Sequence, residues 1–255
     1  MGTTDLFGLE NKVAVVTGAS RGLGRAMALG LAGAGADIIA IASTSENAAE
    51  TVAEVESLGR RAVAIGCRQD DPEEVRRAVS ESIDAFGQVD ILVNNAGIIR
   101  RSPAEDYSDE DWSAVIDTNL NGVFQFCRGI GKHMLNRGQG KIINIASLLS
   151  FSGGIRVPAY SASKGGVMQL TKALANEWAN KGIQVNAIAP GYFATDNTEA
   201  LRADATRNKE ILARIPTGRW GEAEDMQGAI IFLASKASDY VTGHILTVDG
   251  GWMAR

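Results

Sequence analysis

Short apolar runs rich in Val and Ile recur along the whole chain and are separated by longer segments with an amphipathic pattern. Runs of this length that are bounded by turn residues predict buried strands. We expect strands at residues 12–17, 37–42, 61–66, 89–93, 141–147, 183–189 and 245–248. The segments between them place apolar residues at helical spacing. We expect helices at 25–36, 45–58, 71–86, 108–136, from 158 onward, and at 222–235.

Strands and helices alternate regularly, and no linker, internal repeat or low-complexity segment interrupts them. Strand–helix–strand units pack with right-handed crossovers, which gives a parallel sheet covered by helices on both faces. The sequence therefore predicts a single α/β domain over residues 1–255, with a doubly wound parallel sheet of about seven strands. Residues 190–220 include a polar helical part at 198–216, which is either a mobile lid over the substrate or a fixed surface helix.

A glycine-rich turn, GASRGLG at residues 18–24, follows the first predicted strand and precedes a helix. In this order Gly18 permits a tight turn, Gly22 lets the backbone approach a pyrophosphate, and Gly24 lets the helix pack closely. The helix N-terminus adds N–H donors and a partial positive charge. The stretch predicts a Rossmann-type dinucleotide site, and a glycine-rich turn without a ligand is the alternative.

The residues after the second predicted strand, Ala42, Ser43 and Thr44, include no carboxylate. An acidic residue at this place would bond the adenosine ribose of NAD and would repel a 2′-phosphate. Arg21 in the glycine turn could pair with such a phosphate, and a solvated surface arginine is the alternative. The expected cofactor is therefore NADP or NAD, and the sequence favours NADP.

The stretch SLLSFSGGIRVPAYSASK, residues 147–164, carries the candidate reaction chemistry. If Pro158 opens a helix, Tyr160 and Lys164 lie one turn apart on one face. A nearby ammonium lowers a tyrosine pKa by roughly 1–3 units, so that Tyr160 can exchange a proton with a carbonyl or an alcohol. Ser147, at the end of a predicted strand, could hydrogen-bond the same oxygen. The alternative is a chance Tyr–Lys pair beside an ordinary serine.

Two further polar features lie where a ligand is expected. The turn Asn94–Gly97 follows the fourth predicted strand, at the edge where open α/β sheets bind ligands. Asn119 lies in the middle of a predicted helix, where asparagine is locally unfavourable. It has a structural or relay role, or it is a tolerated polar residue.

Composition and charge narrow the functional class. Apolar residues make up 45% of the chain, and the net charge of −5 comes without a basic block, which disfavours a nucleic-acid partner. Cys67 and Cys127 lack the spacing of a disulfide framework or a zinc site, so we expect reduced thiols and no metal. The sequence has no signal-peptide pattern and no run of about 18 apolar residues, so we expect a cytoplasmic protein without a membrane partner.

The chain resembles the short-chain dehydrogenase/reductase family over nearly its whole length, on TGASRGLG at 17–24, NNAG at 94–97, Asn119, Ser147, YSASK at 160–164 and Pro190-Gly191. The resemblance implies that Ser147, Tyr160 and Lys164 are catalytic. It also implies that Asn119 supports a proton-relay water and that Lys164 binds the nicotinamide ribose. The expected cofactor-binding residues are Gly18, Ser20, Arg21, Gly22, Leu23, Gly24, Ser43, Arg68, Asn95, Ala96, Gly97, Tyr160, Lys164, Pro190, Gly191, Phe193 and Thr195.

Two of these residues are assigned by the resemblance alone. Thr195 matches the position that contacts the nicotinamide carboxamide. Arg68 stands where the family usually has an aspartate that contacts the adenine. We therefore expect the adenine to be held differently in this chain, with stacking on Arg68 as one way.

Within that family, the second half is similar to bacterial sugar-acid dehydrogenases of the gluconate and deoxy-gluconate type, on IINIASLLSFSGGIRVPAYSASKGGV, NAIAPGYFATDNT and ASDYVTGHILTVDGGWMAR. A sugar-acid carboxylate needs a cation, and a guanidinium binds it through two hydrogen bonds. Arg156 is our first choice for this contact, ahead of Arg100 and Arg101, and a loop arginine facing solvent or a neighbouring subunit is the alternative. The expected substrate-binding residues are Ser147, Arg156, Arg100 and Tyr192.

The predicted reaction is reversible hydride transfer between NAD(P) and a secondary alcohol of a sugar acid. A 3-oxoacyl thioester reductase stays open as an alternative, because GASRGLG and SENAAE also fit that group. A nucleotide-binding regulator without turnover is a second alternative, against which the Ser–Tyr–Lys set argues. The family resemblance implies a homotetramer, in which Trp220 and Trp252 either wall the pocket or fill a contact between subunits.

Overall fold

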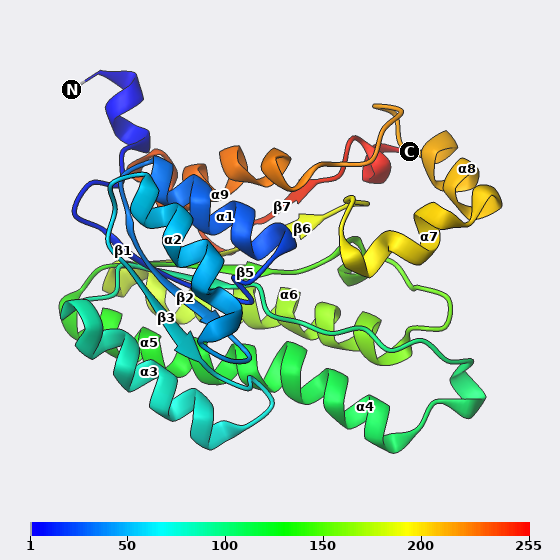
Figure 1. The fold of residues 1–255 in the computed structure, drawn as a ribbon, viewed down its shortest axis with the longest axis horizontal. Coiled ribbons are helices and arrows are strands. Elements are labelled where there is room, and N and C mark those ends of the chain that lie inside the picture. The colour runs from blue at the N-terminus through cyan, green and yellow to red at the C-terminus, as the bar shows by residue number, and fades with distance from the viewer. Residues whose placement is uncertain (1) are drawn as a thin grey trace.

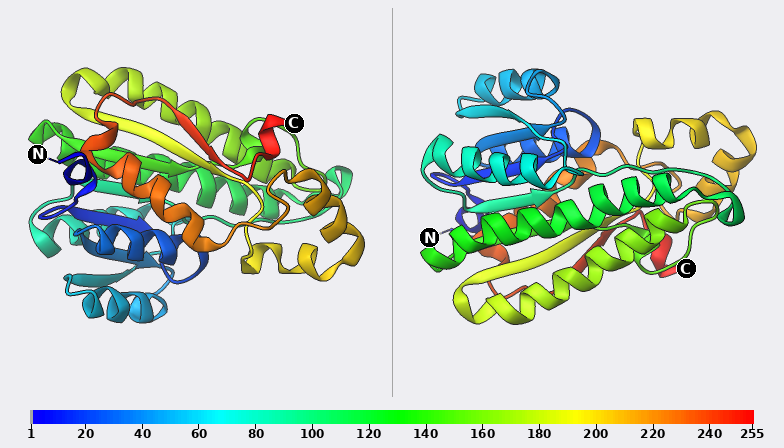
Figure 2. Two further views of the ribbon diagram at one scale, coloured as in Figure 1. Left: turned by 90° about the horizontal axis from the view of Figure 1, so that it is seen from above. Right: turned by 90° about the horizontal axis from the view of Figure 1, so that it is seen from below.

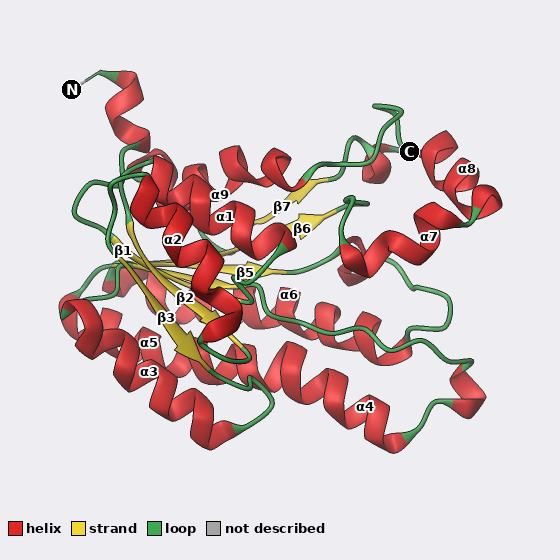
Figure 3. Cartoon of the chain, viewed as in Figure 1, coloured by secondary structure: helices red, strands yellow, loops and turns green. Residues whose placement is uncertain are grey.

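Seven parallel strands form one sheet in the computed structural model, which describes residues 2–255 (Figure 1, Figure 3). The strands are β1 (Val13–Thr17), β2 (Asp37–Ala42), β3 (Ala62–Gly66), β4 (Ile91–Asn94), β5 (Gly140–Ile145), β6 (Ile183–Pro190) and β7 (Ile245–Val248). Their spatial order is β3-β2-β1-β4-β5-β6-β7. The predicted doubly wound parallel sheet is confirmed, and the predicted strand ends agree to within two residues.

Helices cover both faces of the sheet (Figure 2). They are α1 (Gly22–Gly33), α2 (Ala49–Ser57), α3 (Pro72–Phe86), α4 (Asp109–Ile116), α5 (Gly122–Arg137), α6 (Pro158–Trp178), α7 (Glu199–Ala203), α8 (Ala205–Arg214) and α9 (Gln227–Ala234). One face carries α1, α2 and α9, and the other carries α3, α5 and α6. No helix within residues 2–255 is long and apolar enough to cross a membrane.

Burial of the sheet on both faces explains why its strands read as continuous apolar runs. Successive residues of β1 alternate between two cores. Val13 and Val15 pack with the core under α3, α5 and α6, whereas Ala14 and Val16 pack with the core under α1, α2 and α9. Both sets of side chains must therefore be apolar, as is usual for parallel sheets.

The strand order reverses at β1, which pairs with β2 on one side and with β4 on the other. The loops that follow β1 and β4 diverge from this point and leave a crevice at the carboxyl ends of the strands. The glycine turn follows β1 and the polar turn follows β4. The topology therefore brings these two predicted features to the same place.

The helix predicted at 108–136 is divided by a π-helical turn at Asp117–Asn121. The Oδ1 atom of Asn119 accepts a hydrogen bond from the N–H of Ile98 (2.8 Å), and its Nδ2 donates to the carbonyl of Ile98 (2.9 Å). Gln69 Nε2 donates to the carbonyl of Thr118 (2.7 Å). These hydrogen bonds join the π-helical turn to the neighbouring loops. Single π-helical turns inside α-helices often occur near functional sites.

The helical part predicted at 198–216 is also divided, into α7 and α8. Asp204 between them has an extended backbone conformation (φ −81°, ψ 107°). Its carboxylate accepts hydrogen bonds from the N–H groups of Thr206 and Arg207, both at 3.0 Å. Asp204 therefore ends α7 and caps the N-terminus of α8.

Candidate active site

A groove of about 550 Å³ runs along the carboxyl ends of the strands. Its walls are the glycine turn after β1, the polar turn after β4, the end of β5 with the start of α6, and the segment after β6. Every residue that we predicted to bind the cofactor lines it, from Gly18 in the first turn to Thr195 beyond β6. The fold thus gathers in one groove residues that lie far apart in the sequence.

The glycine turn leaves no room for a side chain at Gly18 or at Gly24. A Cβ at Gly24 would lie 2.1 Å from the carbonyl oxygen of Gly18, and a Cβ at Gly18 would lie 2.8 Å from the Cα of Ala96. Gly22 has a φ of +54° and opens α1, whose first turn has no side-chain cap. The first N–H groups of α1 are therefore open to an anion in the groove, and the turn fits the pyrophosphate of a dinucleotide.

Asn95 holds the two turns of the groove together. Its Nδ2 donates to the carbonyl oxygens of Thr17 (3.0 Å) and Gly18 (3.2 Å). The backbone N–H groups of Asn95 and Ala96 both donate to the Oγ1 of Thr17, at 3.1 and 3.0 Å. Because its amide is engaged in this way, we expect Asn95 to support the cofactor by fixing the glycine turn.

Two arginines line the groove, and each lies close to a carboxylate. Arg21 Nε lies 3.2 Å from Asp196 Oδ2, and Arg68 Nη2 lies 3.1 Å from Asp70 Oδ2. Exposed ion pairs contribute only about 0–1 kcal/mol. Both guanidinium groups can therefore turn toward a phosphate or an adenine without a large cost.

Tyr160 lies near the start of α6, and Ser147 lies two residues beyond the end of β5. Burial raises the pKa of Tyr160, whereas a hydrogen bond with Ser147 and the charge of Arg101 lower it again. Lys164 is not among the groups that lower it. The expectation that Lys164 lowers the pKa of Tyr160 therefore stays a prediction for the protein with its cofactor bound.

A backbone carbonyl holds the side chain of Lys164 close to the Tyr160 ring. The side chain is buried, and its Nζ donates to the carbonyl of Ile145 at 2.6 Å. Nζ lies 5.7 Å from the centre of the Tyr160 ring. Burial lowers the pKa of Lys164 to about 8. With this pKa Lys164 is mostly an ammonium at neutral pH, and the carbonyl of Ile145 holds it in place.

We expect Lys164→Met to raise the unfolding temperature of the cofactor-free protein near neutral pH. The folded-state pKa of Lys164, about 8, lies below its ordinary value of 10.5. The buried ammonium therefore costs stability below about pH 8, and the cost fades as the pH rises toward 10.5. Calorimetry of both proteins at increasing pH should show a gain for the variant that shrinks over this range. A gain that does not depend on pH would contradict the assignment.

Two of the arginines considered for the substrate carboxylate, Arg100 and Arg156, are not positioned as a direct contact for it. Arg100 lines the groove, but its Nε lies 3.3 Å from Asp111 Oδ1. Arg156 is exposed, has a φ of +65°, and does not line the groove. Its carbonyl accepts a hydrogen bond from the N–H of Ser102 at 3.1 Å, so that its backbone lies beside the loop after β4.

Arg101 is the arginine whose charge reaches the phenol of Tyr160. The sequence analysis considered it behind Arg156 and left it out of the expected substrate-binding residues, because only its position after the NNAG turn pointed to it. Like Arg156, Arg101 is exposed and does not line the groove. The pairing of Ser102 with Arg156 joins the two loops at this point. Nothing in the local sequence of either loop reveals that pairing.

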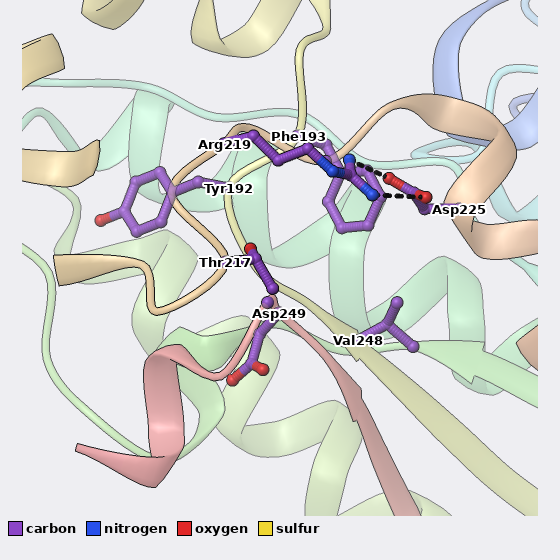
Figure 4. Close-up of a pocket in the computed structure, with 9 residues that line it drawn as sticks. Tyr192, Phe193, Thr217, Arg219, Asp225, Val248 and Asp249 are labelled. Atoms are coloured by element: carbon purple, nitrogen blue, oxygen red, sulfur yellow. Dashed lines mark hydrogen bonds and ion pairs between the residues drawn. The ribbon is translucent and has the colours of Figure 1, made fainter. Parts of the chain in front are cut away.

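Tyr192 lines a neighbouring cavity and not the groove. A smaller cavity of about 240 Å³ is lined by Tyr192, Phe193, Thr217, Arg219, Gly221, Asp225, Val248, Asp249 and Gly250 (Figure 4). The Tyr192 ring packs against Trp252, with ring centres 4.5 Å apart, and against Trp220, at 5.7 Å. Tyr192 does not line the groove, and both tryptophans pack with it in an aromatic cluster against α8.

Asn119 is fully buried and does not line the groove. It lies directly behind the polar turn, because a Cβ at Gly97 would be 3.2 Å from its Oδ1. Ser150 and Ser163 also form hydrogen bonds with residues of the site, and sequence reasoning missed both. The one signal for Ser150 is its spacing from Ser147, which is typical of the start of a helical turn.

Comparison with known proteins gives a consistent result. Residues 12–206 match the family model described as short chain dehydrogenase. The chain is 55% identical over 251 residues to a 2-dehydro-3-deoxy-D-gluconate 5-dehydrogenase of Bacillus subtilis (strain 168), and 53% identical over 250 residues to one of Escherichia coli (strain K12), with 98% of each chain covered in both cases. The crystal structure of a gluconate 5-dehydrogenase from Burkholderia cenocepacia J2315 in complex with NADP and tartrate matches with a TM-score of 0.96 and 42% identity, over 100% of both chains.

Proposed function

The chain belongs to the short-chain dehydrogenase family, and we propose that it transfers a hydride reversibly between NAD(P) and a secondary alcohol of a gluconate or deoxy-gluconate type sugar acid. The observation that carries this proposal is the groove itself. It holds Ser147, Tyr160 and Lys164 opposite a glycine turn that fits a dinucleotide. Relatives that match over 98% of their length and are 55% and 53% identical to the chain are named as dehydrogenases of a sugar acid.

NADP is the favoured cofactor. The Burkholderia relative is in complex with NADP. In this chain the end of β2 carries no carboxylate, and Arg21 stands beside the glycine turn. We expect the turn and the start of α1 to hold the pyrophosphate, and Arg21 and Ser43 to hold the 2′-phosphate. When bound, the nicotinamide exchanges a hydride with the substrate carbon.

The chain's own residues handle the proton and the oxygen. The Tyr160 hydroxyl gives its proton to the carbonyl oxygen during reduction and takes it back during oxidation. Ser147 Oγ accepts a hydrogen bond from the N–H of Leu149 at 3.1 Å, which leaves its own proton free to donate. That proton can hold the same substrate oxygen in place while Tyr160 acts on it.

Arg101 is our proposed contact for the carboxylate of the substrate. We expect Arg101→Gln to raise KM for the sugar acid by roughly 10–100-fold, because a charge-assisted pair is replaced by a neutral one. The control is Arg156→Gln, which removes the same charge from an exposed loop position and should change KM by less than about threefold. Steady-state kinetics of both variants checks this. A larger effect at Arg156 would restore the original choice.

We also propose that the lid is limited to residues 195–204. In α8, Ile211 is buried, Trp220 Nε1 donates to Asn208 Oδ1 at 2.8 Å, and the guanidinium of Arg214 lies 4.1 Å from the Trp252 ring centre. No residue of α7 is buried. Hydrogen exchange should therefore be fast in α7 and slow in α8, and cofactor should slow it in α7. Equal protection of both helices would argue for a fixed surface.

We propose a cytoplasmic homotetramer as the working form. The support is the family resemblance together with two observations. Trp112 and Phe124, on α4 and α5, expose 43% and 41% of their surface, which leaves apolar side chains available for a neighbouring subunit. Cys67 and Cys127 are buried free thiols, as suits a reducing compartment. Light scattering from the purified protein tests the assembly.

A further inference from the structure

We propose that two serines that do not react, Ser150 and Ser163, hold the residues of the candidate active site in register with one another. The residues so positioned are Asn119, Ser147, Tyr160 and Lys164. The inference rests on the proposed function, because it assigns supporting roles around the same site. Each serine hydroxyl donates to the backbone carbonyl of one site residue on α6 and accepts from a second site residue on another element.

Ser150 joins the serine and the lysine of the site. Its Oγ donates to the carbonyl oxygen of Lys164 at 2.7 Å and accepts from the N–H of Ser147 at 3.3 Å. Lys164 is bound to the same segment a second time, because its Nζ donates to the carbonyl of Ile145. The backbone and the side chain of Lys164 are thus both tied to residues 145–150, the segment that carries Ser147.

Ser163 joins the asparagine and the tyrosine. The side chain is fully buried, and its Oγ donates to the carbonyl oxygen of Tyr160 at 2.8 Å and accepts from Nδ2 of Asn119 at 3.3 Å. Asn119 is itself bound through both side-chain atoms to the backbone of Ile98. A continuous series of hydrogen bonds therefore connects the loop after β4 with the residue that carries the reacting hydroxyl.

Ser150 and Ser163 differ from most serines in helices because each forms a hydrogen bond with a residue of another element. A serine that donates to a carbonyl three or four residues earlier is common in helices and nearly neutral in energy. Ser82 in α3 is such a case: it is fully buried and its Oγ donates to the carbonyl of Ala78 at 2.6 Å. Ser163 makes such a bond to Tyr160 and adds a second one with Asn119 on another element. Ser150 instead donates to Lys164 on another helix and accepts from Ser147. Reacting groups must be held within about 0.5 Å of their productive positions, so such bonds act on rate more than on stability.

The test compares Ser150→Ala and Ser163→Ala with Ser82→Ala. We expect kcat to fall about 10-fold in the first two variants, because small displacements at a reacting centre are costly. The cofactor dissociation constant should stay near the wild-type value. Ser82→Ala removes an equally buried hydroxyl and should keep kcat within about twofold. Ser150→Thr retains the hydroxyl and should recover most of the activity lost in Ser150→Ala.

A second readout needs no turnover. The ionisation of Tyr160 can be followed as the tyrosinate absorbance that the Tyr160→Phe variant lacks. The hydrogen bond with Ser147 lowers the pKa of Tyr160. Ser150→Ala should therefore raise that pKa, and Ser82→Ala should leave it unchanged. This titration decides the inference even if no sugar acid proves to be a substrate. The inference would be overturned if the pKa of Tyr160 were unchanged in Ser150→Ala and if, wherever turnover is seen, kcat of Ser150→Ala and Ser163→Ala equalled that of Ser82→Ala.

Discussion

Tyr160→Phe is expected to lower kcat by about 10²–10⁴, because it removes the group that exchanges a proton with the substrate oxygen. The ring and its packing are kept, and Lys164 is held by the carbonyl of Ile145 and does not depend on the phenol. The dissociation constant for the cofactor should therefore change by less than about threefold. Stopped-flow turnover and cofactor titration of the same preparation measure both quantities.

Tyr192→Phe is the matched control for this experiment. It removes the same hydroxyl from a tyrosine that packs against Trp220 and Trp252 and does not line the groove. We expect it to keep kcat within about threefold of wild type. Near-wild-type turnover in Tyr160→Phe would end the proposed mechanism. A comparable loss in Tyr192→Phe would show that the groove has been placed wrongly.

Gly24→Ala is expected to abolish tight cofactor binding, with a loss of about 100-fold or more in affinity. Its Cβ would lie 2.1 Å from the carbonyl oxygen of Gly18 and 2.5 Å from Nδ2 of Asn95. The first atom belongs to the glycine turn and the second to the side chain that fixes this turn, so the turn has to move from the position in which it can approach the pyrophosphate. Forcing a methyl group into such a place typically also costs about 1–3 kcal/mol of stability. Calorimetric titration with NADP and a thermal melt separate the two effects.

Gly33→Ala provides the control within the same helix, because a Cβ at Gly33 meets nothing within 4 Å. Alanine is favoured over glycine in a helix by roughly 0.5–1 kcal/mol, so this variant should be slightly more stable and bind NADP normally. If Gly24→Ala bound NADP as tightly as Gly33→Ala does, the glycine turn would not be the pyrophosphate site.

The sheet and the cofactor groove could be predicted from the sequence because each depends on a local pattern. β1 must be apolar from Val13 to Val16, since these side chains reach two different cores, and this produces the run that marks the strand. The glycine turn is readable because close approach of Gly24 to Gly18 excludes any other residue. Right-handed crossovers between these strands restrict the strand order. The groove is then expected where that order reverses, at the carboxyl ends of the strands.

The substrate side could not be predicted in the same way, because it depends on contacts between distant loops. The charge of Arg101 acts on Tyr160, although neither Arg101 nor Arg156 lines the groove. The pairing that joins the two loops is a backbone hydrogen bond without a sequence signal. The side chain of Tyr192 likewise packs against Trp252, which is distant in the sequence. The π-helical turn at Asp117–Asn121 adds a residue without disturbing the apolar pattern around it.

The choice between the proposed reaction and its alternatives can be made with one assay. Reduced-nicotinamide absorbance would be followed with NADP and NAD over hexonates, deoxy-hexonates, their keto forms and an acetoacetyl thioester. The account predicts that a keto sugar acid is reduced far faster than the thioester, and that NADP(H) is preferred. Faster reduction of the thioester would favour the 3-oxoacyl reductase. Tight cofactor binding without turnover of any compound would contradict the assignment as a sugar-acid dehydrogenase.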